Sequence, residues 1–149
     1  MEKDKIRVIL LEDNEVIRNV LCELFNRRGY EVFAFETPAI CPLHLLPECR
    51  CNENESCADI ILSDLEMPTI SGLQFIKNQK DKSCKILHFA MMSGKWEKEE
   101  LLKAKDLGCK IFHKPFQIND FNEWLDEVEK NISLERKLTD WFKELSGDI

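Results

Sequence analysis

Short apolar segments alternate with amphipathic ones along this chain, and this alternation restricts the folds that it can adopt. Five segments are expected to be strands: residues 6–11, 30–35, 59–62, 84–92 and 110–113. Four stretches with apolar residues at helical spacing lie between or after them: residues 16–29, 72–80, 98–108 and 121–130. The first, third and fourth strands lack the polar alternation of a half-exposed strand, so we expect them to be buried on both faces. The pattern predicts an α/β fold with a doubly wound, five-stranded parallel sheet and helices on both faces.

Two regions depart from this regularity. Pro42 and Pro47 shorten the second helix, and a polar, cysteine-rich stretch follows, so residues 41–57 are expected to be an insertion. Beyond the fifth helix, apolar residues continue at helical spacing, which predicts a C-terminal helical extension over residues 131–149. Residues 1–130 would then form one domain, which agrees with the length of the chain.

The composition excludes several classes of protein. The 149 residues carry 28 acidic and 21 basic side chains, a net charge of −7, so we expect no binding to nucleic acid or to anionic membranes. No apolar run is long enough to cross a bilayer, and the first one is too short for a signal peptide, which predicts a cytoplasmic protein. In that reducing compartment the seven cysteines are expected to be thiols or metal ligands.

Charged and polar residues stand where the predicted strands end. Glu12 and Asp13 follow the first strand, Asp64 the third, Ser93 the fourth and Lys114 the fifth. Because parallel strands bring their carboxyl ends to one edge of the sheet, these side chains should share a pocket. Three carboxylates repel one another unless a cation holds them, and hard oxygen ligands suit Mg²⁺. The hydroxyl and the ammonium group would complete a site for a phosphoryl group.

Four motifs carry a resemblance to a known family: LLEDN, ILSDLEMPTISG, AMMSG and HKPF. In this order, each after a predicted strand, they resemble the receiver domain of two-component response regulators, the fold of the chemotaxis regulator. The resemblance covers roughly residues 5–130. It implies a flavodoxin-like fold with strand order 2-1-3-4-5. It also implies a phosphoacceptor signalling protein, which catalyses only its own phosphotransfer and dephosphorylation.

The resemblance assigns a role to each residue at the strand ends. Asp64 would accept a phosphoryl group from a phosphohistidine on a histidine kinase or a phosphotransfer protein. The Mg²⁺ ligands would be the carboxylates of Glu12, Asp13 and Asp64 and the backbone carbonyl of Glu66. Ser93 and Lys114 would bind the phosphoryl oxygens, and the Lys114–Pro115 peptide bond would be cis.

One position departs from the family pattern. The family usually has Tyr or Phe three residues before the lysine, and this chain has Ile111 there. Phe112 should point to the opposite face of the strand and cannot simply replace that aromatic ring. Which of the two residues takes the switch role stays open.

The family signals through contacts with other proteins, and the C-terminal extension offers a surface for them. An unknown downstream protein is therefore an expected partner. An apolar stripe in the extension needs something to cover it: Leu134, Leu138, Trp141, Phe142 and Leu145. The cover is either the body of the chain itself, a second copy in a homodimer, or another protein.

Three alternative functions use related chemistry. A Mg²⁺-dependent phosphatase of the haloacid dehalogenase type also has an aspartate nucleophile, but its nucleophile follows the first strand, where Asp13-Asn14-Glu15 fits poorly. A phosphorylation-independent pseudo-receiver scaffold usually lacks one of the key residues. A flavodoxin needs a phosphate loop rich in Ser and Thr after the first strand, and this chain has none there.

The insertion concentrates cysteines. Cys41, Cys49, Cys51 and Cys57 fall within 17 residues and predict a thiolate metal site for Zn²⁺, or for an iron–sulfur cluster, with His44 as a substitute ligand. A redox-sensitive dithiol or free thiols remain open. The site would lie at the end of the sheet opposite Asp64. The other three cysteines are expected to be small apolar fillers: Cys22, Cys84 and Cys109.

Overall fold

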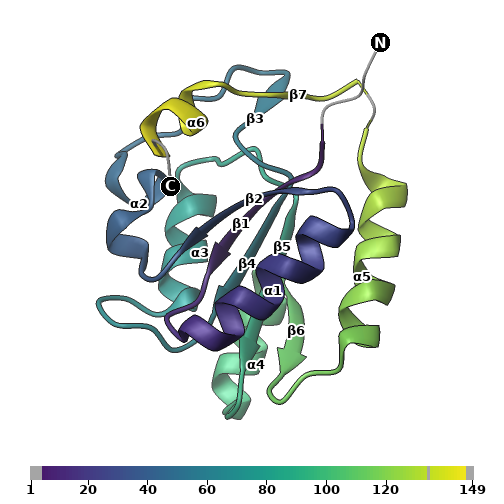
Figure 1. Ribbon diagram of the computed structural model, residues 1–149. Helices are drawn as coiled ribbons and strands as arrows, with labels where there is room; N and C mark the ends of the chain where they lie inside the picture. The colour runs from purple at the N-terminus through teal and green to yellow at the C-terminus, as the bar shows by residue number, and fades with distance from the viewer. Residues whose placement is uncertain (1–4, 134, 147–149) are drawn as a thin grey trace.

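A five-stranded parallel sheet lies at the centre of the computed structural model, which describes residues 5–133 and 135–146 (Figure 1). Its strands follow one another across the sheet as β2 (Glu31–Phe35), β1 (Arg7–Leu11), β4 (Ile60–Asp64), β5 (His88–Ser93) and β6 (Lys110–His113). All four pairings are parallel. Counted along the main sheet alone, this is the order 2-1-3-4-5, so the predicted flavodoxin-like fold is confirmed.

Helices cover both faces of the sheet (Figure 1). One face carries α1 (Glu15–Arg27) and α5 (Ile118–Asn131), and the other carries α3 (Gly72–Asp81) and α4 (Lys98–Asp106). Successive residues of β1 contribute to the two cores in turn: Leu10 packs in the core below α1 and α5, and Leu11 packs in the core below α3 and α4. This double burial explains why the strand is apolar at each position from 8 to 11.

The second crossover is short and irregular, as the prolines predict. It consists of the 3₁₀ turn η1 (Pro38–Ile40) and the four-residue helix α2 (Pro42–Leu45), each with proline in its first turn. The polar stretch that follows holds the two-residue strand β3 (Glu55–Ser56). This strand pairs in parallel with β7 (Lys137–Leu138), outside the main sheet.

The C-terminal extension ends in a helix, as predicted, but it does not continue α5. Helix α5 ends at Asn131, Ile132 is extended (φ −85°, ψ 123°), and α6 (Trp141–Ser146) begins only after β7. The reason is that Ile132 packs on the core below α1 and α5, whereas Phe142 belongs to the opposite core. A straight helix contacts one face of a sheet, so the chain has to leave the helix to cross to the other.

The apolar stripe of the extension is partly covered by the body of the chain. Phe142 is completely buried. Its ring contacts Phe33 and Phe35 edge-on, with ring centroids 5.3 Å and 6.4 Å apart. Leu138 is also buried, whereas Leu145 is 50% exposed. Leu134 lies outside the described residues. The two buried side chains therefore need no partner protein.

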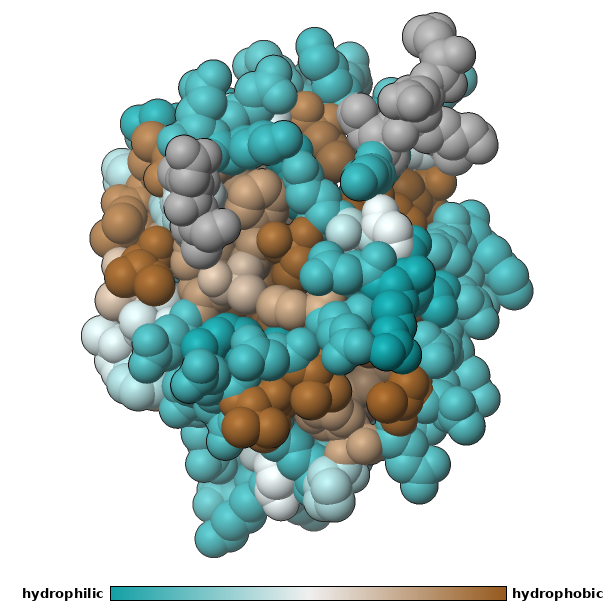
Figure 2. All heavy atoms as spheres, in the orientation of Figure 1, coloured by the Kyte–Doolittle hydropathy of each residue, from teal (hydrophilic) through white to brown (hydrophobic). Residues whose placement is uncertain are grey.

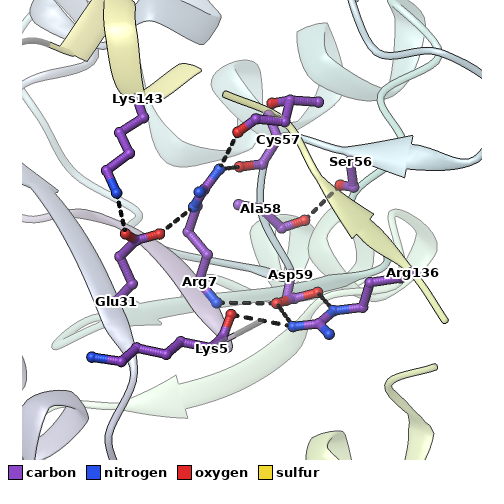
Figure 3. Close-up of polar contacts among 10 residues, drawn as sticks. Lys5, Arg7, Glu31, Ser56, Cys57, Ala58, Asp59, Arg136 and Lys143 are labelled. Carbon is purple, nitrogen blue, oxygen red and sulfur yellow. Dashed lines mark hydrogen bonds and ion pairs between the residues drawn. The ribbon is translucent and has the colours of Figure 1, made fainter. Parts of the chain in front are cut away.

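Ion pairs fasten the extension to the amino-terminal edge of the sheet (Figure 3). The Arg7 guanidinium donates hydrogen bonds to Glu31 (2.6 Å) and to the backbone carbonyls of Cys57 (2.9 Å) and Thr139 (2.8 Å). The Asp59 carboxylate accepts from the Arg7 backbone N–H (3.0 Å) and from Arg136 (2.6 and 2.8 Å). The network joins β1, the start of β4 and the extension.

We expect Asp59→Asn to lower the free energy of unfolding by about 2 kcal/mol, because charged hydrogen bonds are lost among side chains that stay buried. Urea denaturation followed by circular dichroism measures the change. Glu23→Gln is the control, because it removes an exposed ion pair with Arg27, with side chains 65% and 77% exposed, and should cost about 0.5 kcal/mol or less. Equal urea midpoints for Asp59→Asn and Glu23→Gln would show that the network contributes nothing to stability.

Candidate functional site

Three carboxylates meet at the carboxyl ends of β1 and β4. Glu12, Asp13 and Asp64 each offer an oxygen, and these atoms lie within 4.8 Å of one another. Glu12 and Asp64 are buried and Asp13 is exposed, so the cluster opens to solvent on one side. Over residues 5–133 and 135–146, no other group of three His, Cys, Asp or Glu side chains is so compact. The predicted acidic residues are thus brought together.

Backbone hydrogen bonds hold the acidic turn after β1 in place. The Glu12 backbone N–H donates to the carbonyl of Phe35 (3.1 Å), and the Asn14 N–H donates to the Glu12 carboxylate (3.3 Å). The Asn14 side chain in turn caps α1 by accepting from the Ile17 N–H (3.0 Å). The turn therefore passes directly into the N-terminus of α1.

Lys114 reaches into the acidic cluster from the end of β6. Its Nζ lies 2.7 Å from Glu12 Oε1 and 3.0 Å from Asp64 Oδ1. Its backbone N–H donates to the carbonyl of Ser93 (2.8 Å). The Lys114–Pro115 peptide bond is cis, in agreement with the resemblance. The lysine thus joins the strand ends that carry the acids and the serine.

The surroundings of these groups move their pKa values. Burial raises the pKa of Asp64 to about 7, and the neighbouring Glu12 carboxylate adds to the shift. Burial also opposes ionisation of Glu12, but hydrogen bonds from Asp64 and Lys114 outweigh it and lower its pKa. Burial disfavours the charge on Lys114, and the two carboxylates overcome this and raise its pKa. Three acids facing one ammonium group leave an excess of negative charge, which fits a hard divalent cation.

The remaining predicted residues lie at the end of β5 and in the loop after β4. Ser93 is buried at the end of β5, and its hydroxyl accepts a hydrogen bond from the Lys95 N–H (3.0 Å). Glu66 has an exposed side chain in the loop after β4, and the ligand role of its carbonyl stays a prediction. Gly72 ends that loop where any Cβ would overlap the carbonyl oxygen of Asp64. Only glycine allows α3 to begin so close to the acid.

Arg18 belongs to the site and has no counterpart among the predicted residues. From the first turns of α1 its guanidinium donates to the backbone carbonyls of Glu12 (2.9 Å) and Asp13 (3.4 Å). It places a positive charge next to the acidic turn without occupying the carboxylates. Its position five residues after Asp13, on a predicted helix, is the one sequence signal that could have suggested this contact.

The two candidates for the switch role point in opposite directions. Phe112 is buried against α5, where its ring stacks on Phe121 with centroids 4.1 Å apart. Ile111 packs against the core on the opposite face. The predicted alternation along β6 is therefore confirmed, and Phe112 cannot present its ring on the face of Ile111.

The structure does not assemble the four predicted thiols. Cys41 is completely buried beside α2, and burial raises the pKa of its thiol to about 12. Cys49, Cys51 and Cys57 lie together, and Cys84 lies next to Cys57. Cys84 packs against the core below α3 and α4, as predicted for a filler. It is not isolated, however, because the turn before β5 lies beside the start of β4. The cluster lies at the end of β4 opposite Asp64, as predicted.

The chain matches the response regulator receiver domain family over residues 8–126. It is 26% identical over 131 residues to sporulation initiation phosphotransferase F of Bacillus subtilis, an alignment that covers 86% of this chain and 94% of that protein. It is 29% identical over 127 residues to the chemotaxis protein CheY of Thermotoga maritima, covering 83% and 98%. The non-phosphorylated HemR receiver domain of Leptospira biflexa superposes with a TM-score of 0.67 at 26% identity, covering 83% and 94%.

Proposed function

Since the chain belongs to the response regulator receiver domain family of two-component phosphorelay systems, we propose that Asp64 accepts a phosphoryl group from a phosphohistidine. The donor would be a histidine kinase or a phosphotransfer protein. The observation that carries the proposal is the ion pair of Asp64 with Lys114, 3.0 Å apart, inside a cluster of three carboxylates. The phosphorylated chain would then signal through its contacts with a downstream protein.

In the proposed step an Asp64 carboxylate oxygen forms a bond to phosphorus. The bond between phosphorus and the donor's imidazole nitrogen breaks, and its electron pair stays on that nitrogen. Lys114 favours the ionised form of Asp64 and so opposes the effect of burial, and its ammonium group then faces the oxygens of the transferred group. Ser93 would donate its hydroxyl proton to another of those oxygens. The chain modifies itself and does not turn over a separate substrate.

Glu12, Asp13 and Asp64, with the backbone carbonyl of Glu66, would hold Mg²⁺. When bound, the ion neutralises charge on the phosphoryl oxygens and on the carboxylates. The mixture of buried and exposed acids supports this assignment, because Mg²⁺ keeps several waters and needs an open side. Arg18 would keep the acidic turn in position through the two backbone carbonyls that it contacts.

The comparisons favour neither the phosphatase nor the pseudo-receiver alternative. A phosphatase of the haloacid dehalogenase type would use the acid after β1, and there Asp13 is exposed and does not contact Lys114 in any ion pair among the described residues. A pseudo-receiver scaffold would not need the complete set of Glu12, Asp13, Asp64 and Lys114. The presence of that set supports phosphorylation.

The surface beside the acidic cluster suits a protein partner. Figure 2 shows hydrophobic side chains along α1, where Val16 is 71% exposed and Val20 is 44% exposed. We assign this patch to the histidine-bearing donor, because it adjoins Asp13. No helix among the described residues is long and apolar enough to cross a membrane. The cytoplasmic location, the homodimer and the division of the chain at residue 130 stay predictions.

Removal of divalent cations should stop phosphorylation. We expect acetyl phosphate with Mg²⁺ to phosphorylate the full chain, and excess EDTA to reduce the rate by a factor on the order of a hundred or more, because the carboxylate cluster then repels the phosphoryl oxygens. Intact-mass spectrometry over time measures the added phosphoryl group. Adding back Mg²⁺ in excess over EDTA is the control and should restore the rate. Equal rates with and without the metal would contradict the proposed ligand role of the acids.

A further inference from the structure

Four thiols from three separate segments meet near the amino-terminal ends of β4 and β5. Cys49 and Cys51 lie in the irregular stretch after α2, Cys57 lies just before β4, and Cys84 lies in the turn between α3 and β5. The Cys57 thiol lies next to the thiols of Cys51 and Cys84, and the Cys49 thiol lies next to that of Cys51. Cys49, Cys57 and Cys84 also line one small hollow, and no three of the sulfur atoms are within 4.8 Å of one another.

The cluster is buried on one side and open on the other. Cys57 is 1% exposed, whereas Cys49, Cys51 and Cys84 are half-buried. Cys49 lines a surface hollow together with Pro47 and Lys82. A small ion can therefore reach the thiols from solvent, while Cys57 supplies a ligand from the inside.

Backbone N–H groups point at these sulfur atoms. The Cys51 N–H donates to the thiol of Cys49, the Cys57 N–H to that of Cys51, and the Ile86 N–H to that of Cys84. Such donors stabilise thiolates and orient them, as groups around metal ligands do in known sites.

Two positively charged side chains lie beside the cluster. Lys80 and Lys82 lie near Cys84 and add positive charge. A divalent ion with four thiolates has a net charge of two negative units, which the two lysines partly compensate.

We propose that Cys49, Cys51, Cys57 and Cys84 bind one Zn²⁺ ion in a tetrahedral thiolate site. The site would connect the cysteine-rich stretch to the starts of β4 and β5. Side-chain rotations close the present chain of thiols around the ion, as Zn–S bonds of about 2.3 Å require. The ion would have a structural role, because all four ligands come from protein and leave no open position.

Cys41 has no place in this site. Its thiol is completely buried next to α2 and accepts hydrogen bonds from the N–H groups of Leu43 and His44. Burial keeps this thiol protonated at neutral pH. The proposed site therefore contains Cys84, whereas the site that sequence spacing alone suggests contains Cys41.

To test the proposal, the full wild-type chain and three single variants are produced with Zn²⁺ in the growth medium. Zinc is counted per chain by elemental analysis, and Co²⁺ is titrated into metal-free protein to look for the visible bands of a tetrahedral thiolate complex. We expect about one zinc per chain in wild type and in Cys41→Ser. We expect Cys84→Ser and Cys49→Ser to lower the affinity more than about a hundredfold.

Phosphorylation of Asp64 by acetyl phosphate shows that each variant is folded, and it should persist in all of them, because the two sites lie at opposite ends of β4. The half-exposed Cys49 gives a second variant in case Cys84→Ser does not fold. Zinc that is retained in Cys84→Ser and Cys49→Ser would overturn the proposal, as would loss of zinc in Cys41→Ser alone. Metal-free wild type whose cluster oxidises to disulfides would overturn it as well.

Discussion

Asp64→Asn should abolish phosphorylation of this chain by acetyl phosphate, with a loss of rate on the order of a thousandfold or more, because an amide cannot act as the nucleophile. Asp64 is the acid that contacts Lys114, at 3.0 Å, and lies beside Glu12 in the buried part of the cluster. Asparagine has the same shape as aspartate, so the fold should persist. Intact-mass spectrometry in Mg²⁺ measures the added phosphoryl group.

Two further variants make this result specific. Asp81→Asn changes an exposed acid at the end of α3, which pairs with Lys77 at 2.8 Å, and should leave phosphorylation unchanged. Asp13→Asn should slow the reaction without moving the label, because Asp13 is expected to bind metal and not phosphorus. Borohydride trapping followed by peptide mapping locates the modified residue. A label on Asp13 in the wild type would favour the phosphatase alternative and refute the assignment of Asp64.

Phe142→Ala should destabilise the chain by about 3–5 kcal/mol, the usual cost of removing a buried phenylalanine ring. The ring belongs to α6 and is completely buried, in edge-on contact with Phe33 and Phe35 of β2. A domain of this size has a total stability of roughly 5–15 kcal/mol. The variant should therefore unfold at a much lower urea concentration than the wild type.

Leu145→Ala is the matched control, because this residue lies on the same helix and is 50% exposed. We expect it to change the stability by about 0.5 kcal/mol or less. Both variants are measured at two protein concentrations, because stability that comes from a homodimer depends on concentration. If the effect of Phe142→Ala vanishes on dilution, the extension is covered by a second copy and not by the body of the chain.

Local patterns in the sequence were enough to predict the main sheet. The strands Arg7–Leu11 and Ile60–Asp64 are buried at every position. Their apolar runs at residues 8–11 and 60–62 are typical of strands covered on both faces. The acids and the lysine could be placed in one site for a related reason. Parallel strands necessarily bring their carboxyl ends to the same edge, so the residue after each strand joins the others without any knowledge of distant contacts.

Contacts between distant segments could not be read from such patterns. The apolar residues of the extension do recur at helical spacing, but they pack on two different cores. Ile132 packs on one core and Phe142 on the other, so the chain breaks the helix to reach both. Arg7 looks like a polar start of a strand, yet its guanidinium contacts the carbonyl of Thr139, 132 residues away. Such contacts depend on where a segment lies after folding.

The sequence by itself determined the fold class and the acidic site, because these follow from periodicity and from the ends of strands. The strand order came from the resemblance to a family. Only the tertiary structure decided which cysteines meet. Spacing groups Cys41 with Cys49, Cys51 and Cys57, but a short helix buries Cys41 away from them, while the turn before β5 brings Cys84 beside Cys57. Proximity along the chain is a weak guide in an irregular insertion, since no regular periodicity fixes where its side chains point.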